Sequence, residues 1–172
     1  EPYDLYRDGL KIYTTINFTM QKYAEEAVRE HMGSYLQPAF WKEKKGRKNA
    51  PFAKELQSQE IENILTSSMV RSDRYRTMWR SGASPDSIRK VFHTPVPMRV
   101  FSWDGERDTI MTPWDSIRYY KFFLHAGLLS VDPLTGYVKA YVGGVNFKHF
   151  KYDHVMMGRR QVGSTIKPFI YT

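Results

Sequence analysis

Ser164 and Lys167 are the residues whose types and spacing could carry out chemistry. Pro168 has no N–H group and fits an α-helix only in its first turn, so a helix should begin close to Ser164. Side chains three residues apart share one face of a helix and can hydrogen-bond. A serine becomes a nucleophile when a base takes its proton, and positive surroundings such as Arg159 and Arg160 favour a neutral lysine. The pair therefore predicts a nucleophilic serine with a lysine as its base.

A second Ser-x-x-Lys pattern occurs at Ser87 and Lys90. It follows Ser84, Pro85 and Asp86, which offer an N-cap, a proline at the first helical position and an acid in the first turn. We interpret this copy as part of an ordinary surface helix. The Ser164 copy differs because glycine precedes the serine and an apolar run follows the lysine.

Three stretches resemble class A penicillin-binding proteins, the bifunctional enzymes that polymerise and cross-link peptidoglycan. Arg160–Phe169 resembles the active-site serine segment, Gly127–Gly144 the first hairpin of the transpeptidase domain, and Gly9–Asn17 the segment leading into that domain. Residues 37–112 match nothing residue by residue. The resemblance implies an α+β fold of antiparallel hairpins packed with helices, the N-terminal part of a serine β-lactamase-like transpeptidase domain.

The patterning divides the chain into three regions. Residues 1–36 form a lead-in strand and helix, residues 37–111 an accessory or linker region with a basic loop, and residues 112–172 the start of the transpeptidase domain, ending in the serine helix. Periodicity and turn residues predict these elements: strands Leu10–Ile16, His93–Trp103, Leu128–Asp132 and Tyr137–Val142, a strand ending near Met111, and helices from Asn17 to Gln37, Leu56 to Val70, Ser72 to Gly82 and Thr112 to Gly127.

The chain offers few candidate metal ligands. It has no cysteine, and His31 has no second ligand at a helical spacing. His149, Asp153 and His154 form the one tempting cluster, but no further ligand is evident and the family resembled uses no metal. We expect neither a metal nor a cofactor.

A net charge of +8 would suit an anionic polymer, a membrane surface or nucleic acid, or only a solvated basic face. The basic loop between Trp41 and Lys54 is the best stretch for a binding hypothesis. It interleaves aromatic residues with lysines, and Phe40 to Lys54 could bind anionic glycan, a lipid headgroup or a partner.

The resemblance implies a serine-type D-Ala-D-Ala transpeptidase, with Ser164 as nucleophile and Lys167 as general base. It implies peptidoglycan stem peptides and the lipid-linked precursor as partners, β-lactam antibiotics as inhibitors, and no nucleic acid. It also implies a membrane anchor and a glycosyltransferase domain upstream, at the periplasmic face of the cell membrane.

Other functions remain open. A serine β-lactamase or a D,D-carboxypeptidase uses the same Ser-x-x-Lys pattern, and the chain could also be a non-catalytic module that binds glycan or membrane. The Ser-x-Asn and Lys-Thr-Gly motifs of the family do not occur in these residues. We therefore expect the chain to be a soluble, excised fragment that is inactive by itself.

Overall fold

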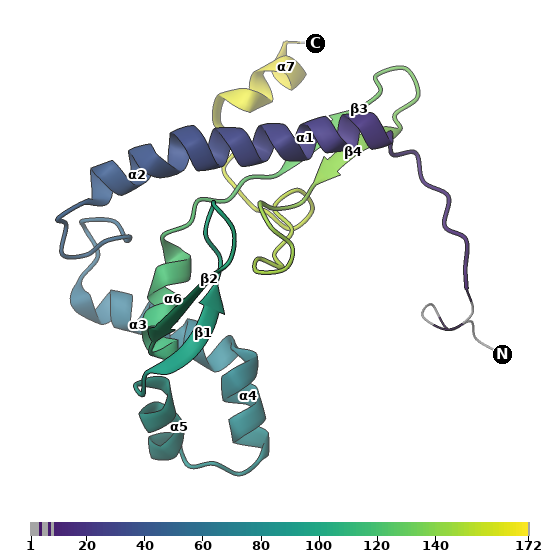
Figure 1. The fold of residues 1–172 in the computed structure, drawn as a ribbon. Coiled ribbons are helices and arrows are strands. Elements are labelled where there is room, and N and C mark those ends of the chain that lie inside the picture. The colour runs from purple at the N-terminus through teal and green to yellow at the C-terminus, as the bar shows by residue number, and fades with distance from the viewer. Residues whose placement is uncertain (1–3, 5–6, 8, 172) are drawn as a thin grey trace. The chain divides into compact units, whose positions relative to one another are not determined.

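The computed structural model of the chain describes residue 4, residue 7 and residues 9–171 (Figure 1). Residues 1–3, 5, 6 and 8 of the predicted lead-in region, and Thr172, lie outside these. The described residues form helices and two antiparallel two-stranded sheets, which confirms the predicted α+β class. The chain divides into two compact units. Unit 1 holds Glu1–Val28 and Ala126–Thr172, and unit 2 holds Arg29–His125.

Helix α1 (Phe18–Glu30) begins in unit 1 where the sequence predicts it. The Asn17 side chain caps it by accepting a hydrogen bond of 3.0 Å from the Met20 N–H. The strand predicted at Leu10–Ile16 is wrong, because these residues form no regular structure and the Ile12 side chain is 78% exposed. Instead the segment hydrogen-bonds through Thr15 Oγ1 to the Val138 carbonyl at 2.7 Å.

Strands β3 (Leu128–Val131) and β4 (Val138–Val142) form the predicted hairpin of unit 1. The turn between them closes through the Gly136 N–H, which donates to the Asp132 carbonyl at 2.8 Å. Gly136 has φ +70°, a conformation that glycine adopts without strain. Ala140 and Val142 of β4 are buried and, with Ala24 and Val28 of α1, form the apolar core of this unit.

Unit 2 is mostly helical. After α1 the chain continues through a π-helical segment η1 (His31–Leu36) into α2 (Gln37–Lys44), and then forms α3 (Ser58–Arg71), α4 (Asp73–Arg80) and α5 (Pro85–Phe92). The prediction that Gln37 ends the first helix is wrong. Pro38 falls in the first turn of α2, where hydrogen bonding changes from the π to the α pattern and a missing N–H costs little.

Gln37 is the one buried polar side chain among the described residues, with 0% exposure. Its amide donates to the Phe122 carbonyl at 2.7 Å and accepts from the Leu124 N–H at 2.9 Å. Both backbone groups follow α6, in a segment without regular structure. Gln37 therefore supplies the hydrogen bonds that this segment lacks.

The core of unit 2 combines aliphatic and aromatic side chains. Its buried members are Met32, Ile61, Leu65, Ile88, Phe92, Val100, Phe101 and Phe123. Phe123 meets the rings of Phe101 and Tyr119 edge to face at centroid distances of 5.1 Å. Trp41 of the predicted basic loop, although 43% exposed, packs one edge against Phe123, with ring centroids 6.3 Å apart.

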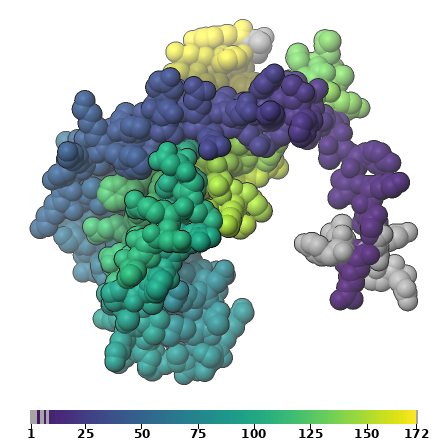
Figure 2. Space-filling model, viewed as in Figure 1, coloured from purple at the N-terminus to yellow at the C-terminus, as the bar shows by residue number. Residues whose placement is uncertain are grey.

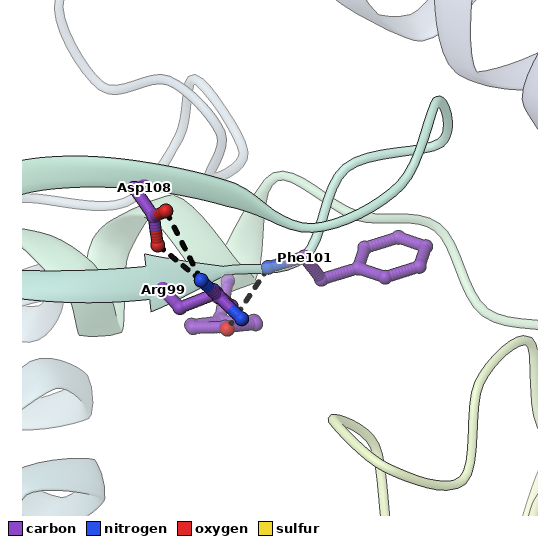
Figure 3. Close-up of polar contacts among 4 residues, drawn as sticks. Arg99, Phe101 and Asp108 are labelled. Carbon is purple, nitrogen blue, oxygen red and sulfur yellow. Dashed lines mark hydrogen bonds and ion pairs between the residues drawn. The ribbon is translucent and has the colours of Figure 1, made fainter.

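Strands β1 (Val96–Val100) and β2 (Arg107–Met111) form the second predicted hairpin. Arg99 and Asp108 lie directly opposite each other, and the guanidinium donates to both carboxylate oxygens, at 2.8 and 3.2 Å (Figure 3). This hydrogen bond, and then the charge of Arg99, lowers the pKa of Asp108. Because both side chains are exposed, the pair fixes register more than it adds stability.

Helix α6 (Pro113–Lys121) has the predicted start but ends earlier than the predicted Gly127. The Thr112 hydroxyl accepts from the Asp115 N–H at 2.9 Å and donates to the Asp115 carboxylate at 2.6 Å. No helix among residues 4, 7 and 9–171 is both long and apolar enough to cross a membrane.

Replacement of Thr112 by alanine should lower the free energy of unfolding by about 1 kcal/mol, because the first turn of α6 loses its cap. Urea unfolding followed by circular dichroism measures the change. Thr77→Ala, at an exposed position inside α4, is the matched control and should cause no loss. An equal loss in both variants would show that Thr112 does not act through its hydroxyl.

Candidate active site

Ser164 lies in a short 3₁₀ turn, η2 (Gly163–Ile166), that leads directly into α7 (Lys167–Ile170). The helical segment thus begins beside Ser164, as the position of Pro168 predicts. Both Ser164 and Lys167 are exposed. The structure shows no hydrogen bond between their side chains, so it places the two residues one turn apart without joining them. Their catalytic roles stay a prediction.

Residues 153–157 form a tight turn on the chain leading to Ser164. The Asp153 carboxylate accepts from the Val155 and Met156 N–H groups at 2.9 and 3.1 Å, and the Asp153 carbonyl accepts from the Met157 N–H at 3.0 Å. The Tyr141 hydroxyl of β4 donates a short hydrogen bond to the same carboxylate. The side chain of Asp153 therefore fastens this turn to the sheet of unit 1.

Two glycines allow this turn to lie close to its neighbours. A Cβ atom on Gly158 would be 2.4 Å from the His154 carbonyl oxygen, a distance that real Cβ atoms do not adopt. A Cβ on Gly143 would be 3.1 Å from the Asp153 carboxylate. Glycine at position 143 therefore leaves room for the Asp153 side chain. The His154 N–H also donates to the Gly143 carbonyl, at 2.7 Å.

The amide of Gln21 holds β4 from the other side. It accepts from the Tyr141 N–H at 2.7 Å and donates to the Tyr141 carbonyl at 2.9 Å, which is the pairing a neighbouring strand would supply. The Asn17 N–H adds a bond of 2.9 Å to the Lys139 carbonyl. Tyr141 is therefore fixed at its backbone by α1 and at its side chain by Asp153.

The Tyr141–Asp153 hydrogen bond shifts the pKa values of both side chains. It raises the pKa of Tyr141 to about 12, with burial and the carboxylate charge as smaller causes. The pKa of Asp153 is lowered by the Tyr141 hydroxyl first and by the backbone N–H groups of Met156 and Val155. The pKa of His154 is lowered, chiefly by burial and next by the charge of Arg160.

These shifts predict how stability depends on pH. The raised pKa of Tyr141 gives stability that is complete below its unfolded pKa of about 10 and is lost as pH rises through about 12. The lowered pKa of Asp153 gives stability that is complete above about pH 4 and is lost as pH falls through its folded pKa. The chain has 12 tyrosines. Subtracting the phenolate absorbance of Tyr141→Phe from that of the wild type at each pH gives the titration of Tyr141.

In Asp153→Asn the Tyr141 pKa should fall towards 10, because a neutral amide no longer opposes the phenolate. Asp132→Asn, in the β3–β4 turn, is the control and should leave the Tyr141 titration unchanged. A Tyr141 pKa that stays near 12 in Asp153→Asn would rule out the carboxylate as its cause.

The candidate metal ligands and the second Ser-x-x-Lys pattern have other contacts. Asp153, one of the three candidate metal ligands, already accepts the hydrogen bonds described above. In the described part of the chain, no three His, Asp or Glu side chains are grouped so that they could hold a metal ion. Ser87 lies in the first turn of α5, where its N–H donates to the capping Ser84 hydroxyl at 3.3 Å. The predicted surface helix is thus confirmed for this second Ser-x-x-Lys pattern.

Comparison with known proteins shows which proteins the chain resembles. The chain is 27% identical to "Penicillin-binding protein 1A" of Escherichia coli (strain K12) over 97% of its own length. It is 24% identical to the protein of that name from Pseudomonas aeruginosa over 98%, and 26% identical to that from Aquifex aeolicus over 96%. The chain is thus similar over nearly all of its length to proteins named penicillin-binding protein 1A.

The family model "Penicillin-binding protein middle domain" matches residues 47–124 of the chain. Most of that range, residues 47–112, lies in the stretch where the sequence alone offered no residue-by-residue resemblance, and the range covers α3 to α6. The chain spans 23% of the length of each of the three relatives. No solved structure matches the chain.

Tyr141, Gln21 and the clamping role of Asp153 were not predicted from the sequence as parts of this site. A sequence signal exists for Asp153 only. Aspartate readily accepts hydrogen bonds from backbone N–H groups two or three residues ahead and so favours a turn. Nothing in the local pattern indicates that Gln21 and Tyr141, 120 residues apart, would meet.

Proposed function

We propose that the chain is part of a peptidoglycan D,D-transpeptidase within a bifunctional glycosyltransferase and transpeptidase. The supporting observation is its similarity to proteins named penicillin-binding protein 1A over nearly all of its length. Penicillin acts on serine enzymes as an acylating agent, so a penicillin-binding serine needs a base beside it. Ser164 with Lys167 has that arrangement in the sequence.

In the proposed reaction Lys167 takes the proton of the Ser164 hydroxyl, whose oxygen attacks the carbonyl carbon of the penultimate D-alanine of a stem peptide. The bond from that carbon to the terminal D-alanine nitrogen breaks, and the amine leaves with a proton. An amine of a second stem peptide then attacks the ester, displaces Ser164 and forms the cross-link. The Ser164 N–H can serve as one of the two donors that such a carbonyl oxygen needs, each of which contributes about 2.7 to 4 kcal/mol to lowering the barrier.

The partners and location belong to the same proposal. Peptidoglycan stem peptides and a lipid-linked precursor are the substrates, and β-lactam antibiotics acylate the same serine. The protein acts at the periplasmic face of the cell membrane, to which an anchor holds it.

Labelling of the full-length protein with a fluorescent penicillin tests this function. Mass spectrometry of the labelled peptide should find the adduct on Ser164. Ser164→Ala should remove the label and Ser87→Ala, the matched control, should keep it. An adduct on Ser87, or on no serine, would refute the assignment.

A further inference from the structure

The hairpin of α4 and α5 carries a concentrated positive charge. Residues 71–92 hold six basic and two acidic side chains, a net charge of +4, which is half of the +8 of the whole chain. The basic members are Arg71, Arg74, Arg76, Arg80, Arg89 and Lys90, and all are exposed. We call this set, together with Trp79, the α4–α5 surface. Residues 71–92, which run from the last residue of α3 to the end of α5, are drawn in teal at the lower end of the view in Figure 2.

Few of these charges are neutralised. Arg76 lies 3.9 Å from Asp73, whose side chain is 100% exposed, so water weakens that pair. The other five basic side chains have no carboxylate within ion-pair distance among the described residues. The α4–α5 surface therefore keeps its charge available for an external anion.

An exposed aromatic side chain lies among the arginines. Trp79 is 57% exposed, and its ring runs parallel to that of Tyr75, with 6.2 Å between centroids and 9° between planes. Arg76, three residues earlier, is a neighbour on the helix surface, and Arg80 follows directly. An exposed aromatic ring thus occurs on the same short helix, α4, as Arg76 and Arg80; Figure 1 shows the course of this helix.

Arginine dominates this surface, although the whole chain has 13 residues each of lysine and arginine. A guanidinium presents a planar fork that matches a carboxylate, whereas an ammonium is a point charge. Residues 41–54 show the opposite composition, with five lysines and one arginine. There Trp41 packs against Phe123, and the Lys44 side chain is only 13% exposed and lies 5.3 Å from the Phe40 ring centroid. The α4–α5 surface is the better fit for a carboxylate-bearing ligand.

We propose that the α4–α5 surface binds the peptidoglycan polymer, with arginines on carboxylates of the stem peptides and Trp79 against the apolar face of a sugar ring. This inference rests on the proposed function for the choice of polymer. A membrane is the weaker choice, because anionic lipid attracts lysine and arginine alike through charge. Binding here would raise the effective concentration of stem peptides for the rest of the same protein.

Co-sedimentation of the 172-residue chain with purified peptidoglycan sacculi tests the proposal. Arg76→Lys/Arg80→Lys keeps the positive charge and the helix propensity, but it replaces two planar guanidinium groups by ammonium groups. This variant should weaken binding about ten-fold. Trp79→Ala should weaken it by a similar factor. Arg29→Lys/Arg107→Lys, two exposed arginines elsewhere, is the matched control and should bind as the wild type does.

Conversion of the sacculus carboxylates to amides should weaken binding of the wild type. The loss should be about as large as the loss that Arg76→Lys/Arg80→Lys shows on untreated sacculi. Unchanged binding to amidated sacculi, or equal affinity of the wild type and Arg76→Lys/Arg80→Lys, overturns the proposal. Tighter binding to phosphatidylglycerol vesicles than to sacculi would assign the surface to a membrane and overturn it as well. Sacculus binding needs no acylation, so a failure of penicillin labelling at Ser164 is a separate result.

Discussion

Lys167→Ala is expected to slow acylation of Ser164 by penicillin about 10²- to 10⁴-fold in the full-length protein, the range associated with loss of a general base. Ser164 would keep its place in the turn at Gly163–Ile166, but no group one turn away could take its proton. Stopped-flow or time-course labelling with a fluorescent penicillin measures the acylation rate. The variant should fold normally, because Lys167 is exposed.

The second Ser-x-x-Lys pattern supplies the control for this variant. Lys90→Ala changes an exposed lysine on α5 and should leave the acylation rate within experimental error. Equal losses in Lys167→Ala and Lys90→Ala would mean that the wrong copy was chosen. A raised penicillin concentration for half-saturation without a slower acylation step would indicate that Lys167 binds the antibiotic and takes no proton.

Gln37→Ala should have the largest effect on stability, lowering the free energy of unfolding by about 3 kcal/mol. The substitution leaves the Phe122 carbonyl and the Leu124 N–H without their partner and opens a cavity at a fully buried position. Urea unfolding followed by tryptophan fluorescence reports the change, because all four tryptophans lie in unit 2.

Two further variants separate the causes. Gln37→Met keeps most of the volume and loses the hydrogen bonds, so it should show the share of the unpaired backbone groups. Gln59→Ala removes an exposed amide from α3 whose partner is Asn63, and it should change the free energy of unfolding by no more than about 0.5 kcal/mol. A small effect of Gln37→Ala would show that water replaces the amide at this position.

The helix starts were predictable because their signals are local. Asn17, Ser84 and Thr112 each accept a hydrogen bond from the backbone N–H three residues later, as their types and positions indicate. The two hairpins were also predictable, since alternating strands flank short turns at Gly105 and Gly136. In these elements the local preference and the final structure agree.

The elements that the sequence did not predict correctly depend on contacts between residues far apart in the sequence. The sequence predicts a half-buried strand at Leu10–Ile16, but alternation records only a preference, and no sheet partner takes up the whole segment. Gln37 looks like the end of a helix until its two backbone partners, more than 80 positions later, are known. In the candidate site, the helical turn at Ser164 is predictable from the nearby Pro168. The Tyr141–Asp153 hydrogen bond is not predictable, because it joins residues of two different elements.

Unit 1 is built from two pieces of sequence separated by the 97 residues of Arg29–His125. Its cross-links, such as Gln21 to Tyr141, join residues from both pieces. A ribosome adds about 5 to 20 residues per second, so the N-terminal piece must wait on the order of 5 to 20 seconds for its partner strand. All of unit 2 is synthesised within that interval. The inserted unit therefore has the time to fold first, and its folding would shorten the effective loop that unit 1 must close.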